Sequence, residues 1–210
     1  MKVIKSTGYI DYDVQLGDHI VHFYDSDEQR SSVLVEYIKD AIRQNHKCLC
    51  ILDKDMAAAL QDRLLKLNMD VGYYLIEGQL LFMTHDEFYM NNGHFDDEKL
   101  AKLIVEATEA AGKQGWAALR IANEFTWAVA DNNNVDAWLR FEAAINNYLG
   151  KLPAIMLCQY NQRMISGQIA NNLIKTHPYV ILGEEIHENP FFIRPEKFLK
   201  GYQPEGRFYT

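Results

Sequence analysis

Glycine-rich loops of the kind that bind nucleotide phosphates are missing from this sequence. Neither G-x-x-x-x-G-K-S/T nor G-x-G-x-x-G occurs anywhere in its 210 residues. Such a cradle needs converging backbone amides, usually from glycines, and a lysine or a helix dipole that adds positive charge. The first strand-to-helix junction, YDSDEQRSS, instead carries Asp25, Asp27 and Glu28. These acids suit the start of a helix and repel a triphosphate, so the sequence argues against ATP hydrolysis at a P-loop.

Long apolar runs and clusters of basic residues are missing as well. No apolar run approaches the ~20 residues that span a bilayer. The N-terminus, MKVIKSTGYIDYD, has no continuous apolar stretch of the signal-peptide type. We therefore expect a cytoplasmic protein that makes no membrane contact. The formal net charge is -8, and no lysine or arginine cluster offsets it, so we expect no direct contact with nucleic acid.

Cysteine is scarce, and the histidines and cysteines do not have the spacing of a metal site. Cys48, Cys50 and Cys158 are an odd number of thiols in apolar, strand-like runs, as buried reduced cysteines would be. His19 and His22 form H-x-x-H, but residues three apart on a strand point to opposite faces. Cys48 and Cys50 share a face, yet no further ligand stands at zinc-finger spacing. The sequence therefore predicts no metal site and no cofactor.

Strands and helices alternate along the whole chain. Ser26 and Gln29 have the spacing of a capping box, which predicts a helix from Asp27 to Gln44. The segment YYLIEGQLLFM is expected to form a strand pair or a bent strand. Further strands are expected in HIVHFY, KCLCILD, WAALRIANE, PAIMLCQYN and PYVILGEE. This alternation predicts a three-layer α/β fold with a mainly parallel central sheet covered by helices on both faces.

Polar and aromatic residues lie at the carboxyl ends of several predicted strands. In open α/β sheets, ligands bind at that edge. Any one of these residues, taken singly, is more simply explained as a loop cap, but their convergence predicts a pocket. The predicted lining residues are Tyr24, Asp53, Glu124, Gln159 and Tyr160, with Trp127 in the adjacent loop.

Arg120 lies inside a predicted strand, where a buried guanidinium needs an acidic or polar partner. Glu142 on the following helix and Asp53 at another strand end are the candidate partners. We include Arg120 in the predicted pocket lining. The structural alternative is that Arg120 and Glu142 form a buried support pair.

Seven motifs follow one another along the chain: GDHIVHFY, EGQLLFM, LRIANEFTWA, FEAAINN, LCQYN, THPYVI and NPFF. Together they resemble the MEDS family, a sensory domain named after methanogens, methylotrophs and the repressor DcmR. The resemblance implies a RecA-like or KaiC-like fold that has lost its phosphate loop. It also implies a role in signalling or transcriptional control, with small organic compounds as ligands.

The resemblance also implies boundaries and one departure. It divides the chain into an N-terminal extension (1–16), a sensory domain (17–192) and a C-terminal tail (193–210). The first-strand pattern of the family is His-x-Cys-x-x-Tyr, in which His19 and Tyr24 match but Val21 replaces the cysteine. His22 is a candidate substitute whose side chain should face the other way. His19 and His22 are thus added as candidate ligand-binding residues.

Three hypotheses for the function follow. The first is a non-catalytic sensory domain that binds a small organic ligand of one-carbon, halogenated or hydrocarbon type. It would pass the signal to a transcriptional or kinase output, in an output domain or a partner protein. The second is an interaction module that signals by oligomerising, for example as a homodimer. The third is a divergent nucleotide hydrolase with Glu124 as general base, which the acidic, glycine-free junction disfavours.

Overall fold

The computed structural model describes residues 14–89, 97–130, 135–183 and 185–202. Most of the expected N-terminal extension and the last residues of the expected tail lie outside these ranges. The described residues form a seven-stranded sheet in the order β3-β2-β4-β5-β1-β6-β7. Its neighbouring strands are parallel except for the antiparallel pair β6–β7. The strands are β1 (His19–Tyr24), β2 (Lys47–Ile51), β3 (Leu80–Met83), β4 (Leu119–Glu124), β5 (Ala154–Asn161), β6 (Tyr179–Leu182) and β7 (Glu185–Glu188).

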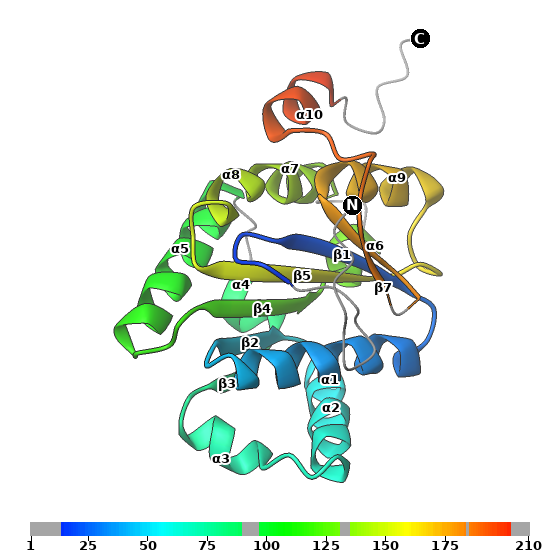
Figure 1. Ribbon diagram of the computed structural model, residues 1–210. Helices are drawn as coiled ribbons and strands as arrows, with labels where there is room; N and C mark the ends of the chain where they lie inside the picture. Colours follow the sequence, from blue (N-terminus) through cyan, green and yellow to red (C-terminus); the bar gives the residue numbers. More distant parts are fainter. Residues whose placement is uncertain (1–13, 90–96, 131–134, 184, 203–210) are drawn as a thin grey trace.

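Helices cover both faces of this sheet, which confirms the predicted three-layer α/β fold (Figure 1). The longer helices are α1 (Asp27–Arg43), α2 (Lys54–Lys66), α5 (Asp97–Lys113), α7 (Val135–Ala144) and α9 (Gly167–Thr176). The shorter ones are α3 (Val71–Ile76), α4 (His85–Tyr89), α6 (Thr126–Ala130), α8 (Asn146–Leu149) and α10 (Pro195–Gly201). None of the described helices is long and apolar enough to cross a membrane.

Strict alternation along the strands builds two hydrophobic cores. Ile20 on β1 faces one core, which α1 and α2 close with residues such as Leu34 and Leu60. Val21, the next residue, faces the other core, which α5, α7 and α9 close with residues such as Trp138. Because successive strand residues point to opposite faces, the sequence position of each polar strand residue decides which helices it meets.

The first strand-to-helix junction has the local structure that its residues dictate. Ser26 is the N-cap of α1, and its hydroxyl accepts a hydrogen bond from the Gln29 backbone N–H at 3.3 Å. The Gln29 side chain in turn accepts from the Asp25 backbone N–H at 3.0 Å. The helix begins at Asp27, as predicted, and the acidic side chains of its first turn interact favourably with the helix dipole.

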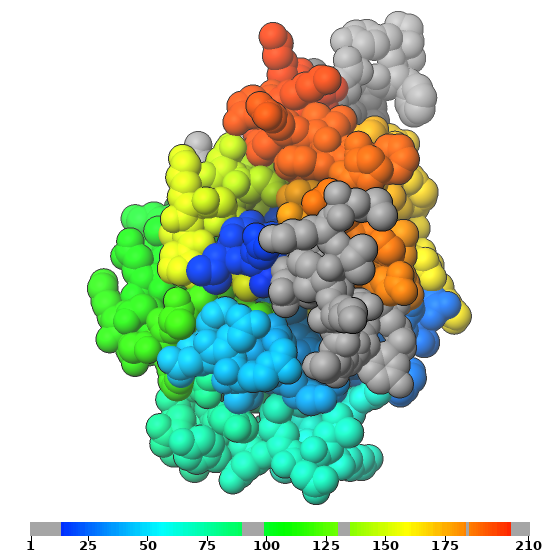
Figure 2. Space-filling view, in the orientation of Figure 1, coloured from blue at the N-terminus to red at the C-terminus, as the bar shows by residue number. Residues whose placement is uncertain are grey.

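Two segments near the ends of the sheet add detail to the expectation. YYLIEGQLLFM is neither a strand pair nor a bent strand, because its first half ends helix α3 and only Leu80–Met83 forms a strand. The break between them is a turn at Gly78, whose positive φ of 71° favours glycine. In the expected C-terminal tail, α10 packs on α7 and α9 at one end of the molecule (Figure 2).

Candidate functional site

Five polar or aromatic residues meet at the carboxyl edge of the sheet, on the face that α1 covers. Parallel register aligns Glu124 on β4, Gln159 on β5 and His22 on β1 in one row across three neighbouring strands. Tyr24 follows two residues after His22 on the same face, and Arg30 reaches this row from the first turns of α1. We call His22, Tyr24, Arg30, Glu124 and Gln159 the carboxyl-edge cluster. Each of its members is less than a tenth exposed.

Hydrogen bonds fix the orientation of these side chains. The Gln159 amide donates to His22 Nδ1 at 2.8 Å and to the backbone carbonyl of Arg30 at 3.2 Å. The Tyr24 hydroxyl donates to Glu124 Oε1 at 2.8 Å, and the hydroxyl of Thr126 donates to the same oxygen. Since both amide hydrogens of Gln159 are used, His22 Nδ1 is an acceptor and its Nε2 carries the hydrogen.

The cluster leaves several buried polar atoms without a hydrogen-bond partner among the described residues. They are Gln159 Oε1, His22 Nε2, and Nε and Nη1 of Arg30. The remaining contacts of the Arg30 guanidinium are Asp27, at 3.2 Å, and the Tyr24 ring, 5.8 Å from its centroid. A buried polar group without a partner costs about 1–3 kcal/mol. The cluster therefore presents several donors and one acceptor that a bound molecule could satisfy.

Burial sets the charges in this cluster. It lowers the pKa of His22 to about 4, so the imidazole is neutral at neutral pH. Burial also raises the pKa of the Glu124 carboxyl, although hydrogen bonds from Thr126 and Tyr24 partly offset the effect. The pKa of the Tyr24 hydroxyl is raised by burial and by the nearby Glu124. The cluster thus combines a neutral donor at His22 with the guanidinium of Arg30.

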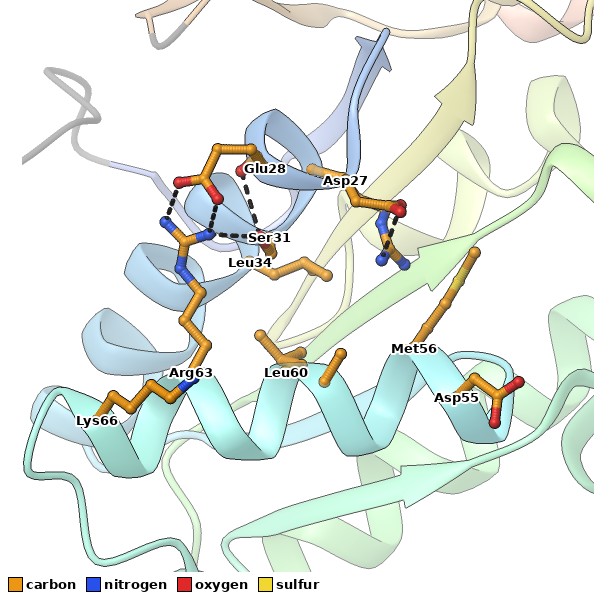
Figure 3. A pocket seen from close by; sticks show the side chains of 11 residues that line it. Asp27, Glu28, Ser31, Leu34, Asp55, Met56, Leu60, Arg63 and Lys66 are labelled. Carbon is orange, nitrogen blue, oxygen red and sulfur yellow. Dashed lines mark hydrogen bonds and ion pairs between the residues drawn. The ribbon is translucent and has the colours of Figure 1, made fainter.

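A groove of about 530 Å³ opens beside this cluster, between α1 and α2 (Figure 3). Its floor is apolar, from Leu34, Met56 and Leu60, and its rim carries charged residues. One end is closed by Arg63, which pairs with Glu28 at 2.8 Å. Arg30 lines the groove and also belongs to the carboxyl-edge cluster, so it is the residue that the two share. The lining residues are Asp27, Glu28, Arg30, Ser31, Leu34, Asp55, Met56, Ala59, Leu60, Arg63 and Lys66.

A second cluster of polar residues lies on the opposite face of the sheet, beneath α7 and α9. It comprises His19 on β1, Glu142 on α7, Cys158 on β5 and His177 directly after α9. The side chains of all four are fully buried, and their ligand atoms lie within 4.8 Å of one another. We call these four residues the His–Glu–Cys cluster. Tyr160 lies beside it, and its hydroxyl donates to Glu142 Oε1.

Burial also shapes the charge of the His–Glu–Cys cluster. Burial, together with the neighbouring His177, lowers the pKa of His19 to about 4. Burial alone would raise the pKa of Glu142, but His177 and His19 together hold it below its ordinary value. The Glu142 carboxylate is therefore anionic and faces the imidazole of His19, with 3.1 Å between Oε2 and Nε2.

The expected pairing of Arg120 with Glu142 or Asp53 is wrong. The Arg120 guanidinium forms an ion pair with Asp40 on α1, and its Nε donates to His46 Nδ1 at 3.2 Å. As the second residue of β4, Arg120 lies near the amino end of the strand and faces α1, whereas Glu142 lies across the sheet. Arg120 is therefore a support residue of the α1 face and does not reach the carboxyl-edge cluster.

Asp53 and Trp127 meet through a residue that the sequence analysis did not single out. His85 lies 3.3 Å from Asp53 Oδ1, and its ring stacks on Trp127 with 4.5 Å between ring centroids. These side chains follow the ends of β2, β3 and β4, outside the carboxyl-edge cluster. The ten predicted residues therefore divide among four places, and four of them, His22, Tyr24, Glu124 and Gln159, come together.

Comparison with known proteins settles the family. The family model described as "MEthanogen/methylotroph, DcmR Sensory domain" (MEDS) matches residues 18–178. The chain belongs to the MEDS family. The transcriptional repressor DcmR of Methylorubrum extorquens is 25% identical over 166 residues, which cover 79% of this chain and 60% of the repressor. This chain thus spans less than two thirds of that relative's length.

Solved structures support the predicted fold of this MEDS domain. A KaiC-like protein of Pyrococcus horikoshii OT3 is similar over 79% of this chain and 70% of its own, with a TM-score of 0.54 and 11% identity. The flagellar accessory protein FlaH of Methanocaldococcus jannaschii has a TM-score of 0.51 and 13% identity, over 82% and 76% of the two chains. At such identities the likeness shows the fold alone.

The first strand of this MEDS domain explains the departure noted at Val21. His19 and His22 face opposite sides of the sheet, as predicted, so His22 does not take the place of a cysteine at position 21. Val21 pairs in register with Cys158 on β5, whose Sγ lies 3.3 Å from His19 Nε2. A thiol therefore faces His19 from the neighbouring strand.

Arg30 and His177 were missed by the sequence analysis, and Cys158 was predicted only as a buried thiol. Arg30 precedes Leu34 and Ile38 at intervals of four, which places it on the buried face of α1 and could have identified it. His177 lies in the motif THPYVI, but nothing in the local pattern of that motif indicates that it meets His19.

Proposed function

We propose that this chain is a non-catalytic sensory domain that binds a small organic molecule in the α1–α2 groove and at the carboxyl-edge cluster. The observation that supports this most strongly is the set of buried, unpartnered polar atoms on His22, Arg30 and Gln159, next to an apolar groove. Ligand sites commonly combine an apolar cavity of about 300–1,000 Å³ with a few convergent polar groups, and this site has both features.

The polar atoms indicate the chemistry of the ligand. His22 Nε2 and the Arg30 guanidinium are donors, so they match a ligand that carries an acceptor such as an alcohol, carbonyl or carboxylate oxygen. Gln159 Oε1 accepts a hydrogen bond from a hydroxyl or amine. The Leu34, Met56 and Leu60 floor suits a short alkyl or halogenated group. We therefore propose one-carbon, halogenated or short hydrocarbon derivatives as the ligand class.

Helix α1 links this site to the rest of the domain. Gln159 holds the backbone carbonyl of Arg30, and Glu28 pairs with Arg63 on α2. A ligand that engages Arg30 or Gln159 changes the contacts that set the position of α1 relative to α2. We propose that this change is passed to a transcriptional or kinase output, since the relative DcmR is named as a transcriptional repressor.

A thermal-shift panel tests this proposal. The probes are methanol, methylamine and dichloromethane, with ATP and magnesium as the comparison. Because a ligand that binds only the folded state raises the melting temperature, we expect at least one organic probe to raise it and ATP with magnesium to have no effect. A shift with ATP and magnesium alone, or with none of the probes, contradicts the proposed ligand class.

Two matched variants of α2 test the proposed location. Ala58 and Ala59 are both exposed, but only Ala59 lines the groove. A bulky Ala59→Trp side chain should fill the groove and abolish the shift produced by the active probe. Ala58→Trp should leave that shift intact. Equal responses in the two variants would place the ligand outside the groove.

A further inference from the structure

We propose that the His–Glu–Cys cluster is a closed, four-ligand site for a zinc-type divalent cation. The ligands are Nε2 of His19 and His177, Oε2 of Glu142 and Sγ of Cys158. The proposal does not rest on the sensory function, because the cluster lies on the other face of the sheet from the carboxyl-edge cluster.

Four of the six distances between the ligand atoms are close to those of tetrahedral coordination, and all six are within 4.8 Å. His19 Nε2 lies 3.1 Å from Glu142 Oε2 and 3.3 Å from Cys158 Sγ. His177 Nε2 lies 3.4 Å from the same carboxylate oxygen, which is 3.8 Å from the thiol sulfur. Zinc bonds of about 2.0–2.3 Å in a tetrahedron separate neighbouring ligand atoms by about 3.3–3.8 Å. The four side chains are therefore already arranged around one common point.

The outer hydrogen bonds of the two histidines fix which nitrogen faces that point. Asn146 donates its amide hydrogens to the carbonyls of Glu142, Ala143 and Thr176, so its oxygen faces His19. The His19 Nδ1–H then donates to this oxygen, at 3.2 Å. The Nε2 of His19 therefore carries no hydrogen, and its lone pair faces the Glu142 carboxylate. This is the imidazole tautomer that a metal ligand needs.

His177 is held in the same way. Its Nδ1 lies 2.7 Å from the backbone carbonyl of Leu173, which can only accept, so Nδ1 carries the hydrogen. Its Nε2 is fully buried and makes no hydrogen bond to the described residues, although it points at the Glu142 carboxylate. A proton on one imidazole would satisfy one His–Glu contact and leave the other lone pair facing the carboxylate. A divalent cation satisfies all four ligands.

The charge of the cluster and the hydrogen bonds around it also fit this cation. Loss of the Cys158 proton to solvent on binding leaves one thiolate and one carboxylate, which balance the two positive charges inside the core. The Tyr160 hydroxyl donates a hydrogen bond to Glu142 Oε1 and accepts one from Trp138 Nε1 at 2.8 Å. These bonds hold the carboxylate so that Oε2 is directed at the cluster. Mixed nitrogen, oxygen and sulfur ligands at four positions favour zinc, and the absence of an open position favours a structural role.

Wild-type protein provides the first test. Chain purified from zinc-supplemented cells is analysed for bound metal and by X-ray absorption at the zinc edge. We expect one zinc per chain, with one sulfur and two imidazoles among its ligands. Metal-free protein, or zinc bound by oxygen and nitrogen alone, would overturn the assignment and leave a protonated cluster in its place.

Matched cysteine variants provide the second test. Chain refolded with cobalt(II) should show tetrahedral bands and a thiolate-to-cobalt charge-transfer band. Cys158→Ala should lose the charge-transfer band, whereas Cys50→Ala, which removes a buried thiol beside Cys48, should keep it. Retention of the band in Cys158→Ala, or its loss in Cys50→Ala, rejects this site. If Cys158→Ala does not fold, the sulfur count at the zinc edge of the wild type decides.

Discussion

The Tyr24 hydroxyl donates a hydrogen bond to Glu124 Oε1 at 2.8 Å and so joins the ends of β1 and β4 across the intervening strand β5. Both side chains are nearly fully buried, and no lysine or arginine forms an ion pair with Glu124 among the described residues. This carboxyl is therefore stabilised by hydroxyl donors rather than by an opposite charge.

Removing the Tyr24 hydroxyl should destabilise the domain and perturb Glu124. Tyr24→Phe leaves a buried carboxyl oxygen with fewer donors, which should lower the free energy of unfolding by about 1–3 kcal/mol. It should also raise the pKa of Glu124 further, since Tyr24 is one of the groups that lower it. Denaturant unfolding measures the first effect. Tyr73→Phe, at a tyrosine that is 54% exposed, is the matched control and should leave stability unchanged.

The ion pair between Arg120 and Asp40 should carry much of the stability of the α1 face. Asp40→Ala removes the carboxylate that Arg120 contacts and leaves a guanidinium with 0% side-chain exposure uncompensated. Such a loss typically costs about 3–5 kcal/mol. The control is Glu36→Ala, which breaks an exposed pair with Lys39 on the same helix and should cost about 0–1 kcal/mol. Equal effects in urea titrations would mean that Arg120 is not dependent on Asp40.

His22 should make stability depend on pH in one direction. Its pKa is about 4 in the folded protein and 6.5 for the free side chain, so only the unfolded state binds the proton between these values. The contribution of neutral His22 is therefore fully present above pH 6.5 and is lost as the pH falls to about 4. The slope for one such group is about 1 kcal/mol per pH unit.

Comparison of variants isolates this effect. His22→Gln removes the titrating group, so the stability difference between wild type and variant should shrink or reverse as the pH falls through that window. His187→Gln, at an exposed position on β7, should follow the wild-type curve. A wild type and a His22→Gln variant with parallel pH profiles would contradict the burial of a neutral His22.

The sequence predicted the layers of the fold because each layer depends on local patterns. Ser26 and Gln29 specify the start of α1, and the alternation of His19 to Tyr24 specifies which residues share a face. The convergence of Tyr24, Glu124 and Gln159 also follows from strand ends alone, since parallel strands bring their carboxyl ends to one edge. His22 was a candidate only through the resemblance to the first-strand pattern of the family.

Contacts between distant elements could not be predicted in this way. Arg120 faces α1, and its partner Asp40 precedes it by 80 residues, so the choice of the following helix was wrong. The strand period tells which face a residue takes, but not which helix covers that face. His177 meets Glu142 only because α7 and α9 pack side by side on the sheet. Their approach depends on the tertiary packing of the second core, which no local motif encodes.

The most direct test of the account is an NMR titration of isotope-labelled protein with methanol, methylamine and dichloromethane. We predict that the active compound shifts the side-chain N–H signals of Arg30 and Gln159 and the ring signals of His22. Signals of His187 and Tyr73, which lie elsewhere, should not move. Shifts confined to residues outside the groove and the carboxyl-edge cluster, or no shifts with any of the compounds, would contradict the proposal that this MEDS domain senses its ligand there.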